Sequence, residues 1–404
     1  MKILWLSSGF LHPTTRGGQI RTLETLRRLR TRNEIDYLAL HDGSREALER
    51  ASEYCSRAWP IPFQLAPRDS IRFWMQTVAG LFSRLPVVAV RKQSKSARLA
   101  IAKLLEGERF DLVVCDFLTP CVNLASAQPF VLFEHNVETL IWRRYAERAA
   151  DPIRRTFYSS QASRLLAFER AACRRAVQVI AVSEADAATL RDLCGARQVT
   201  AIPTGVDASY FARPPGSGEV QNPALLFAGS MDWLPNIDGV LWFVKQVLPI
   251  IRRQMPSCHL TIAGRRPARG IRKLVADPLI RVTGTVDDIR PYLWESSVSI
   301  VPLRIGSGTR LKIYEAMAGE IPVVSTTIGA EGLDVSSPEN IRIADSPESF
   351  AEQCLELLQS PEARDRQAAE ARRMVEERFS WEAVSVRFEE ILLACLARRY
   401  ADYR

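Results

Sequence analysis

Residues 298–322 read VSIVPLRIGSGTRLKIYEAMAGEIP, and this stretch decides the fold. The apolar run VSIVPL predicts a buried strand of a parallel sheet. The small residues GSGT (306–309) predict a loop, and a helical pattern begins at Arg310. A strand, a glycine-bearing loop and a helix in this order form the repeating unit of doubly wound α/β domains.

The loop between this strand and helix is suited to binding an anion. Glycines let backbone N–H groups approach a ligand closely, and the N-terminus of the following helix adds its dipole. Three cations, Arg304, Arg310 and Lys312, surround the loop. Because such cations can take up charge on several phosphate oxygens, the stretch predicts a diphosphate site. The alternative is an ordinary turn with surface charges.

The same alternation of apolar runs and helical segments extends over the whole chain. In the first half, the runs cover residues 2–7, 35–40, 111–117, 130–133, 177–183 and 199–204. In the second half, they cover residues 224–230, 259–264, 280–286, 298–303, 321–326 and 340–344. We therefore predict two doubly wound α/β domains. The Pro- and Gly-rich residues 208–223 between them have the composition of a linker, so a ligand cleft between the domains is expected.

The composition is that of a globular protein. Of 404 residues, 47% are apolar and 25% are charged, which argues against disordered, collagen-like and coiled-coil classes. No apolar run approaches the ~18 residues that a membrane-spanning helix needs. The first residues, MKILWLSS, run into polar sequence rather than into the apolar core of a signal peptide. We therefore expect a cytoplasmic protein.

The residue types that commonly bind metals in proteins do not have the spacing of a metal site in this sequence. The eight cysteines include no CxxC pair, and the four histidines are widely separated. No two aspartates are spaced Asp-x-Asp, the arrangement that holds a divalent ion on a diphosphate in single-domain transferases. We expect no bound metal and no cofactor.

The basic residues are unevenly distributed. Lys and Arg number 54 against 46 Asp and Glu, a net charge of +8, which raises the question of an anionic partner. Between Arg68 and Arg98 there are seven basic residues and one acid. Apolar residues in RDSIRFWMQTVAGLFSRLP (68–86) recur at helical spacing, which predicts docking on an anionic membrane surface rather than on nucleic acid. The alternative is that this apolar face packs on the core of its own domain.

Segments of the second half, taken together, resemble the retaining glycosyltransferases of family 4, which share the two-domain GT-B fold. The segments are LLFAGSMDWLPNIDGVLWF, LTIAGRRP, VTGTVDDI and VPLRIGSGTRLKIYEAMAGEIPVVSTTIGAEGL, in this order. The first half follows with Gly17-Gly18 after the first strand, EHN (134–136), VSE (182–184) and IPTGVD (202–207).

This resemblance implies two Rossmann-like domains that face a cleft. Residues 1–207 would form the acceptor-side domain, residues 208–223 a linker and residues 224–380 the nucleotide-sugar-binding domain. A C-terminal helix, residues 381–404, would return to the first domain. The implied reaction moves a sugar from a nucleotide-diphosphate sugar to a hydroxyl of a lipid-linked or polysaccharide glycan, with retention of the anomeric configuration.

The resemblance and the charge pattern together assign the site residues. Glu315 takes the place of the family carboxylate that holds the ribose hydroxyls, and His135 that of the histidine near the transferred sugar. The catalytic residues are then His135, Arg310 and Lys312. Glu134, Asn136 and Glu184 would lie near the acceptor or the sugar. The donor-binding residues are Gly17, Gly18, Arg21, Arg304, Gly306, Ser307, Gly308, Thr309 and Glu315.

The chain departs from the family pattern in two places. Ser307 stands where the family commonly has a Glu that touches the sugar ring. The residues after the first strand of the second domain, GSMDW (229–233), lack the Arg and Lys that the family often has there. We infer that neutralisation of the phosphates has moved to Arg304, Arg310 and Lys312.

Three other functions compete with this interpretation. A nucleotide-sugar epimerase would use the same donor pocket with Glu134, Glu138 or Glu184 as acid or base. A nicotinamide dehydrogenase would need a complete GxGxxG, but the third glycine would fall at Leu311. A nucleotide- or membrane-binding protein without transferase activity would fit the two departures.

Overall fold

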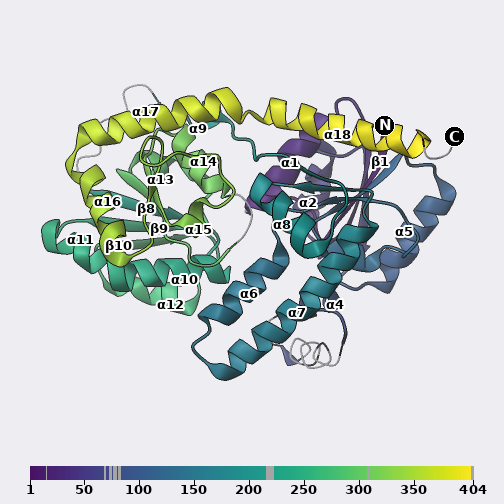
Figure 1. Cartoon of the computed structure of the whole chain (residues 1–404), viewed down its shortest axis with the longest axis horizontal. Helices are drawn as coiled ribbons and strands as arrows, with labels where there is room; N and C mark the ends of the chain where they lie inside the picture. Colours follow the sequence, from purple (N-terminus) through teal and green to yellow (C-terminus); the bar gives the residue numbers. More distant parts are fainter. Residues whose placement is uncertain are drawn as a thin grey trace. The chain divides into compact units, whose positions relative to one another are not determined.

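The computed structural model describes residues 1–14, 16–67, 70–71, 75, 80, 83–214, 223–306 and 310–401 (Figure 1). The chain forms two compact units, each with its own sheet. Unit 1 contains Met1–Thr14, Gly18–Ile202 and Val384–Arg404. Unit 2 contains Thr15–Gly17 and Pro203–Ala383.

In the described residues, unit 1 is built on a seven-stranded parallel sheet with the order β3-β2-β1-β4-β5-β6-β7. Strands such as LVVCD (112–116) are buried along their whole length, because helices cover both faces of a parallel sheet. The strands are β1 (Lys2–Ser7), β2 (Glu34–His41), β3 (Arg57–Pro62), β4 (Leu112–Asp116), β5 (Val131–Phe133), β6 (Gln178–Ala181) and β7 (Val199–Ala201).

Unit 2 has a six-stranded parallel sheet in its described part, with the order β10-β9-β8-β11-β12-β13. Its core draws buried residues from Val206 to Phe379, and VSIV (298–301) is buried at every position. The strands are β8 (Ala224–Ala228), β9 (His259–Ala263), β10 (Ile280–Gly284), β11 (Val298–Val301), β12 (Val323–Ser325) and β13 (Arg342–Ile343).

The helices of unit 1 connect its strands. Local signals fix their ends: Ser183 caps α8 by accepting a hydrogen bond from the Asp186 N–H, and Gly195 ends that helix in the left-handed conformation (φ 67°). The helices and 3₁₀ turns are α1 (Gly17–Leu29), α2 (Arg45–Glu49), η1 (Arg50–Glu53), α4 (Val87–Val90), α5 (Lys95–Gly107), η2 (Thr119–Asn123), α6 (Glu138–Arg148), α7 (Pro152–Arg175) and α8 (Glu184–Cys194).

The helices of unit 2 end in α18, whose residues from Val384 onward belong to unit 1. There Phe388 packs against Trp5 and Phe133, with ring centroids 5.8 Å and 5.0 Å apart. The elements are α9 (Ala208–Phe211), α10 (Leu234–Trp242), the π-helical turn η3 (Phe243–Val247), α11 (Leu248–Gln254), α12 (Arg269–Arg272), η4 (Lys273–Ala276), α13 (Arg290–Trp294), α14 (Leu311–Ala318), α15 (Thr327–Ala330), α16 (Pro347–Gln359), α17 (Pro361–Arg378) and α18 (Trp381–Ala401).

The predicted fold class, two doubly wound Rossmann-like domains, is confirmed. Each predicted strand is present, and β3 is an additional strand that the sequence analysis did not predict. The first residues of the predicted linker form α9, whose Phe211 lies in the core of unit 2. The cleft between the domains stays a prediction. No helix in the described part of the chain is both long and apolar enough to span a bilayer.

Candidate functional site

The strand order reverses between β1 and β4 in unit 1 and between β8 and β11 in unit 2. Neighbouring connections leave such a switch point in opposite directions, and the space at the carboxyl ends of the two strands binds ligands in doubly wound folds. The predicted diphosphate loop follows β11. Asp116, which the sequence analysis did not single out, ends β4.

Two glycines bring backbones together at the ends of β8 and β9. Gly229 N donates to Ala263 O at 2.8 Å, and a Cβ built on Gly264 would lie 1.7 Å from Gly229 O. A Cβ on Gly229 would lie 2.7 Å from Lys312 Nζ. No side chain fits at either position, so the Lys312 ammonium lies directly against the backbone at the end of β8.

Lys312 is held in the first turn of α14. Its Nζ donates to Asn236 Oδ1 at 3.2 Å and lies 4.2 Å from the centroid of the Phe227 ring. Burial, together with the nearby Arg310, lowers the pKa of Lys312 to about 7 against the opposing effect of Glu315. An amine with this pKa is poised to gain a proton when an anion approaches.

Glu315 lies three residues further along α14, so the two side chains leave the same side of the helix. Burial raises the pKa of Glu315 to about 7, and Lys312 opposes this shift. An acid and a base on neighbouring positions therefore both titrate close to neutral pH. This pair of perturbed groups at a switch point is therefore a candidate functional site.

Arg310 precedes α14 and is buried, with 5% of its surface exposed. Its guanidinium lies 5.8 Å from the Trp233 ring centroid. A Cβ on Gly306 would lie 2.0 Å from Arg310 Nη2, so the loop and the guanidinium are closely packed. The predicted donor-binding residues of the loop, Ser307, Gly308 and Thr309, lie outside the described residues.

Arginines next to this cluster are paired with carboxylates. Arg304 makes a bidentate ion pair with Asp238 of α10, at 2.9 Å and 2.6 Å, so its charge is matched inside the protein. Arg265 donates to the Ser230 hydroxyl at 3.3 Å and to Asp232 at 3.0 Å. The sequence analysis assigned no role to Arg265. The sequence did contain a signal for Arg265, because this residue follows Gly264 at the end of β9, the strand next to β8.

In unit 1, His135 forms the centre of a buried polar network. Its Nε2 lies 2.8 Å from Asp116 Oδ1, and its Nδ1 lies 3.1 Å from Arg21 Nη1. Asp116 also accepts from the hydroxyls of Thr22 (3.0 Å) and Ser7 (3.3 Å). Burial lowers the pKa of His135, as does Arg21, against the opposing effect of Asp116.

Aromatic rings fix the plane of the His135 imidazole. The Phe117 ring stacks on it at 3.8 Å between centroids and 9° between planes, and Phe133 lies at 4.2 Å. Phe117 adopts φ 69°, a backbone conformation that costs energy for a bulky residue. A Cβ on Gly18 would lie 2.4 Å from Phe117 Cζ. Gly18 thus provides room for the ring that covers His135, whereas Gly17 is exposed at the start of α1.

The other residues predicted near the acceptor occupy different surroundings. Glu134 is buried, and burial and the nearby Glu169 raise its pKa. Asn136 hydrogen bonds to the side chain of Glu138, whose pKa burial raises to about 7. Glu184 is exposed in the first turn of α8. Their place near the acceptor or the sugar stays a prediction.

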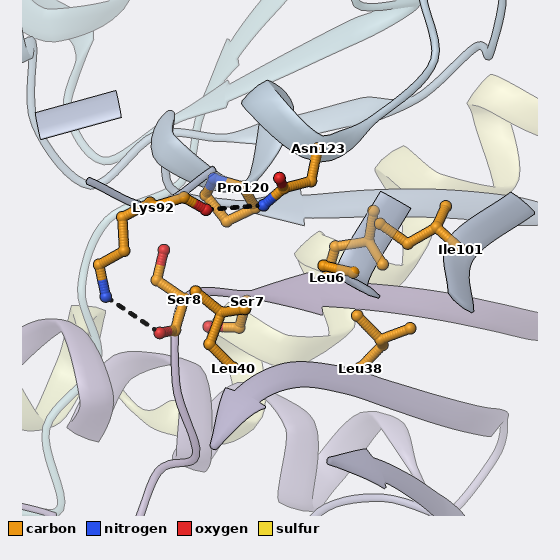
Figure 2. A pocket seen from close by; sticks show the side chains of 10 residues that line it. Leu6, Ser7, Ser8, Leu38, Leu40, Lys92, Ile101, Pro120 and Asn123 are labelled. Atoms are coloured by element: carbon orange, nitrogen blue, oxygen red, sulfur yellow. Dashed lines mark hydrogen bonds between the residues drawn. The ribbon is translucent and has the colours of Figure 1, made fainter. Parts of the chain in front are cut away.

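A small cavity lies at the carboxyl ends of β1 and β2 in unit 1 (Figure 2). Leucines from these strands form its floor, and Lys92 lies at its rim, where Nζ donates to Ser8 O at 3.2 Å. Asn123 Nδ2 donates to Lys92 O at 2.9 Å. The cavity thus joins an apolar floor to a cationic rim. Among the described residues, no group of three or more His, Cys, Asp or Glu side chains is placed to hold a metal ion.

Comparison with known proteins assigns both halves of the chain. Residues 15–210 match the family model described as Glycosyltransferase Family 4, and residues 222–360 match the model described as Glycosyl transferases group 1. An uncharacterized 44.6 kDa protein in the cps region of Klebsiella pneumoniae is 28% identical over 141 residues, or 33% of this chain. Those residues make up 36% of that protein, so the chain spans about a third of its length.

Two solved structures share the fold over nearly the whole chain. Sucrose-phosphate synthase from Thermosynechococcus elongatus has a TM-score of 0.76 at 19% identity and covers 98% of this chain and 100% of its own. HepE from Anabaena, in complex with UDP-glucose, has a TM-score of 0.69 at 14% identity with the same coverage. These likenesses and the two sheets define the class as a two-domain α/β protein with the GT-B fold. With both family models matched, the chain belongs to the glycosyltransferases of this fold.

Proposed function

We propose that this protein transfers a sugar from a nucleotide-diphosphate sugar to a hydroxyl of a glycan acceptor and retains the anomeric configuration. One observation carries the proposal. Lys312 and Glu315 lie on the helix after the glycine loop at the unit 2 switch point, and the pKa of each is shifted to about 7. Such a pair suits a ligand with phosphates at one end and ribose hydroxyls close by.

Each group at this site has a role in the proposed reaction. Breaking the anomeric bond develops negative charge on the departing diphosphate, so Arg310 and Lys312 lower the barrier by binding the phosphate oxygens. A metal ion is then unnecessary. The two Glu315 oxygens accept from the two ribose hydroxyls. The acceptor hydroxyl attacks from the face that the diphosphate leaves, and a phosphate oxygen takes its proton, so no protein nucleophile takes part.

The comparisons support the donor class and leave the acceptor to be identified. HepE binds UDP-glucose, which makes this nucleotide sugar the first donor to try. A lipid-linked or polysaccharide glycan is the acceptor that we propose. The cavity in Figure 2 has room for about one water molecule, so a sugar does not fit inside it.

The decisive experiment measures release of nucleoside diphosphate from nucleotide sugars, with and without a glycan-lipid acceptor. We expect acceptor-dependent release and a product in which the anomeric configuration, read by NMR, is retained. Lys312→Ala should lower turnover by ~10²-fold. Lys245→Ala, an exposed lysine of the same unit, serves as the matched control. If no nucleotide sugar stabilises the protein against heat or is turned over, the proposal is wrong.

We also propose that residues 68–92 dock on an anionic membrane surface, a role that rests on their sequence pattern. Part of this segment, including Arg68, Arg72, Trp74, Val78 and Phe82, lies outside the described residues. Two of its described apolar side chains are exposed, Ile71 by 80% and Met75 by 67%, whereas Val87 and Ala89 are buried. Binding to anionic but not to neutral vesicles, weakened by salt and by charge reversal at the segment's arginines, is expected. Equal sedimentation with and without vesicles would remove this role.

A further inference from the structure

The hydrogen bonds of His135 fix which of its nitrogens carries a proton. A guanidinium has donors and no acceptor, so the contact between Arg21 Nη1 and His135 Nδ1 requires a lone pair on Nδ1. The single proton of a neutral imidazole is then on Nε2, which donates to Asp116 Oδ1 at 2.8 Å. Both ring nitrogens are therefore used inside unit 1.

The surroundings of this imidazole hold it in place. His135 is 2% exposed, and Phe117 and Phe133 lie on its ring. A second proton on the ring would break the bond to Arg21 and would place two cations side by side in a buried site. A side chain in this state is poorly suited to exchange protons with a substrate.

We propose that Asp116 and His135 form a relay that positions Arg21: the Asp116 carboxylate holds the neutral imidazole, and the imidazole holds the guanidinium. The negative charge of Asp116 thereby stabilises the charge of Arg21 through an intervening ring. Arg21 is one of the residues predicted to bind the donor, so this inference rests on the proposed function. It reassigns His135 from a catalytic to a positioning residue and adds Asp116.

A substitution series separates a relay from proton transfer. The amide of Gln has one donor and one acceptor group, so His135→Gln can donate to Asp116 and accept from Arg21 without titrating. We expect His135→Gln to keep KM for UDP-glucose and kcat within about threefold of the native values. His135→Ala breaks the relay and should raise that KM by about tenfold or more, the effect of losing a hydrogen bond to a charged group. His12→Ala removes another buried histidine of unit 1 and controls for general loosening, so its KM should stay unchanged.

The ring of His135 can also be observed directly, without any activity. Nitrogen-15 NMR of the full chain labelled at histidine, with the His135 signals assigned from their loss in His135→Gln, should show a neutral ring protonated on Nε2. This state should persist from pH 5.5 to 8.5. A ring that titrates in this range, a proton on Nδ1, or a folded His135→Gln as inactive as His135→Ala would each overturn the relay.

Turnover and the NMR spectrum of His135 distinguish failure of the relay from failure of the proposed function. If native protein binds and turns over no nucleotide sugar, the proposed function fails, and the NMR result still decides whether the relay exists. If turnover is normal and the tautomer is wrong, the relay fails and the transferase remains.

Discussion

Lys312 Nζ donates a hydrogen bond to Asn236 Oδ1 at 3.2 Å, and this bond joins the first turn of α14 to the first turn of α10. Asn236 Nδ2 in turn donates to Ser230 O at 2.9 Å, so the ammonium is anchored to the segment that follows β8. The lysine is thus oriented before a ligand arrives. An oriented cation loses less entropy on binding a phosphate than a free side chain does.

We expect the affinity for UDP-glucose to have a bell-shaped pH dependence with its maximum near pH 7. The pKa of Lys312 is about 7 in the free protein, and a bound diphosphate raises it, so affinity falls as pH rises above 7. Glu315, with a pKa of about 7, accepts from ribose only when ionised, so affinity also falls below 7. UDP-glucose itself does not titrate between pH 6 and 8.5, and calorimetry over this range measures both limbs. An affinity that is flat from pH 6 to 8.5 would contradict the two pKa shifts.

Glu315→Gln should weaken binding of UDP, even with no sugar attached, because an acceptor is exchanged for a donor that faces a hydroxyl. We expect a loss of about tenfold and the disappearance of the acid limb of the pH profile, while the alkaline limb remains. Glu320→Gln, at an exposed position just after α14, is the control. Native affinity for UDP in Glu315→Gln would exclude the ribose role.

The folded state should lose stability between pH 5 and 8 through three carboxyls around α6, of which Glu134 and Glu169 are buried and Glu138 is partly buried. Burial raises the pKa of Glu134 and Glu169 and brings that of Glu138 to about 7, whereas unfolded glutamates titrate near 4.5. Between these values the folded state holds protons that the unfolded state has released, so stability decreases as pH rises. Glu138→Gln should remove on the order of 2 kcal/mol of this decrease in the free energy of unfolding.

Urea unfolding at pH 5, 6.5 and 8 measures this effect as the difference between native protein and variant. Glu147→Gln, at an exposed position of the same helix, should leave the pH slope unchanged. If Glu138→Gln also kept the native pH slope, the pKa of Glu138 would not be raised in the folded state, and this prediction would be wrong.

Turnover should survive a chelator. Arg310 and Lys312 supply the positive charge at the predicted phosphate site, so EDTA at millimolar concentration should change kcat by less than about twofold. The control adds Mg²⁺ or Mn²⁺ after the chelator. Complete loss of turnover that either ion restores would mean that a metal, and not these side chains, neutralises the departing diphosphate.

The strands could be predicted from the sequence wherever they are buried on both faces, because such strands are continuous apolar runs. The exception, β3, reads RAWPIP, and its two prolines argue against a strand. Proline is tolerated there because β3 is the edge of the sheet, where half of the backbone N–H groups have no neighbour to bind. Edge position depends on strand order, which no local pattern contains.

The site in unit 2 was largely predictable because its residues are close in the sequence, from Gly306 to Glu315. The network in unit 1 was not. Asp116 is 19 residues from His135, and the two meet only because β4 and β5 are neighbours. Arg304 was expected to face phosphate, and its pairing with Asp238 depends on how α10 packs. Contacts of this kind follow from tertiary structure.

The contact between Trp5 and Phe388 has a consequence for synthesis. Trp5 is fully buried in the first strand, and part of its cover comes from α18, which is synthesised after all the strands of both units. Vectorial folding from the N-terminus therefore cannot close the interior of unit 1, although its sheet can form early. Until α18 emerges, the large apolar ring of Trp5 stays partly uncovered.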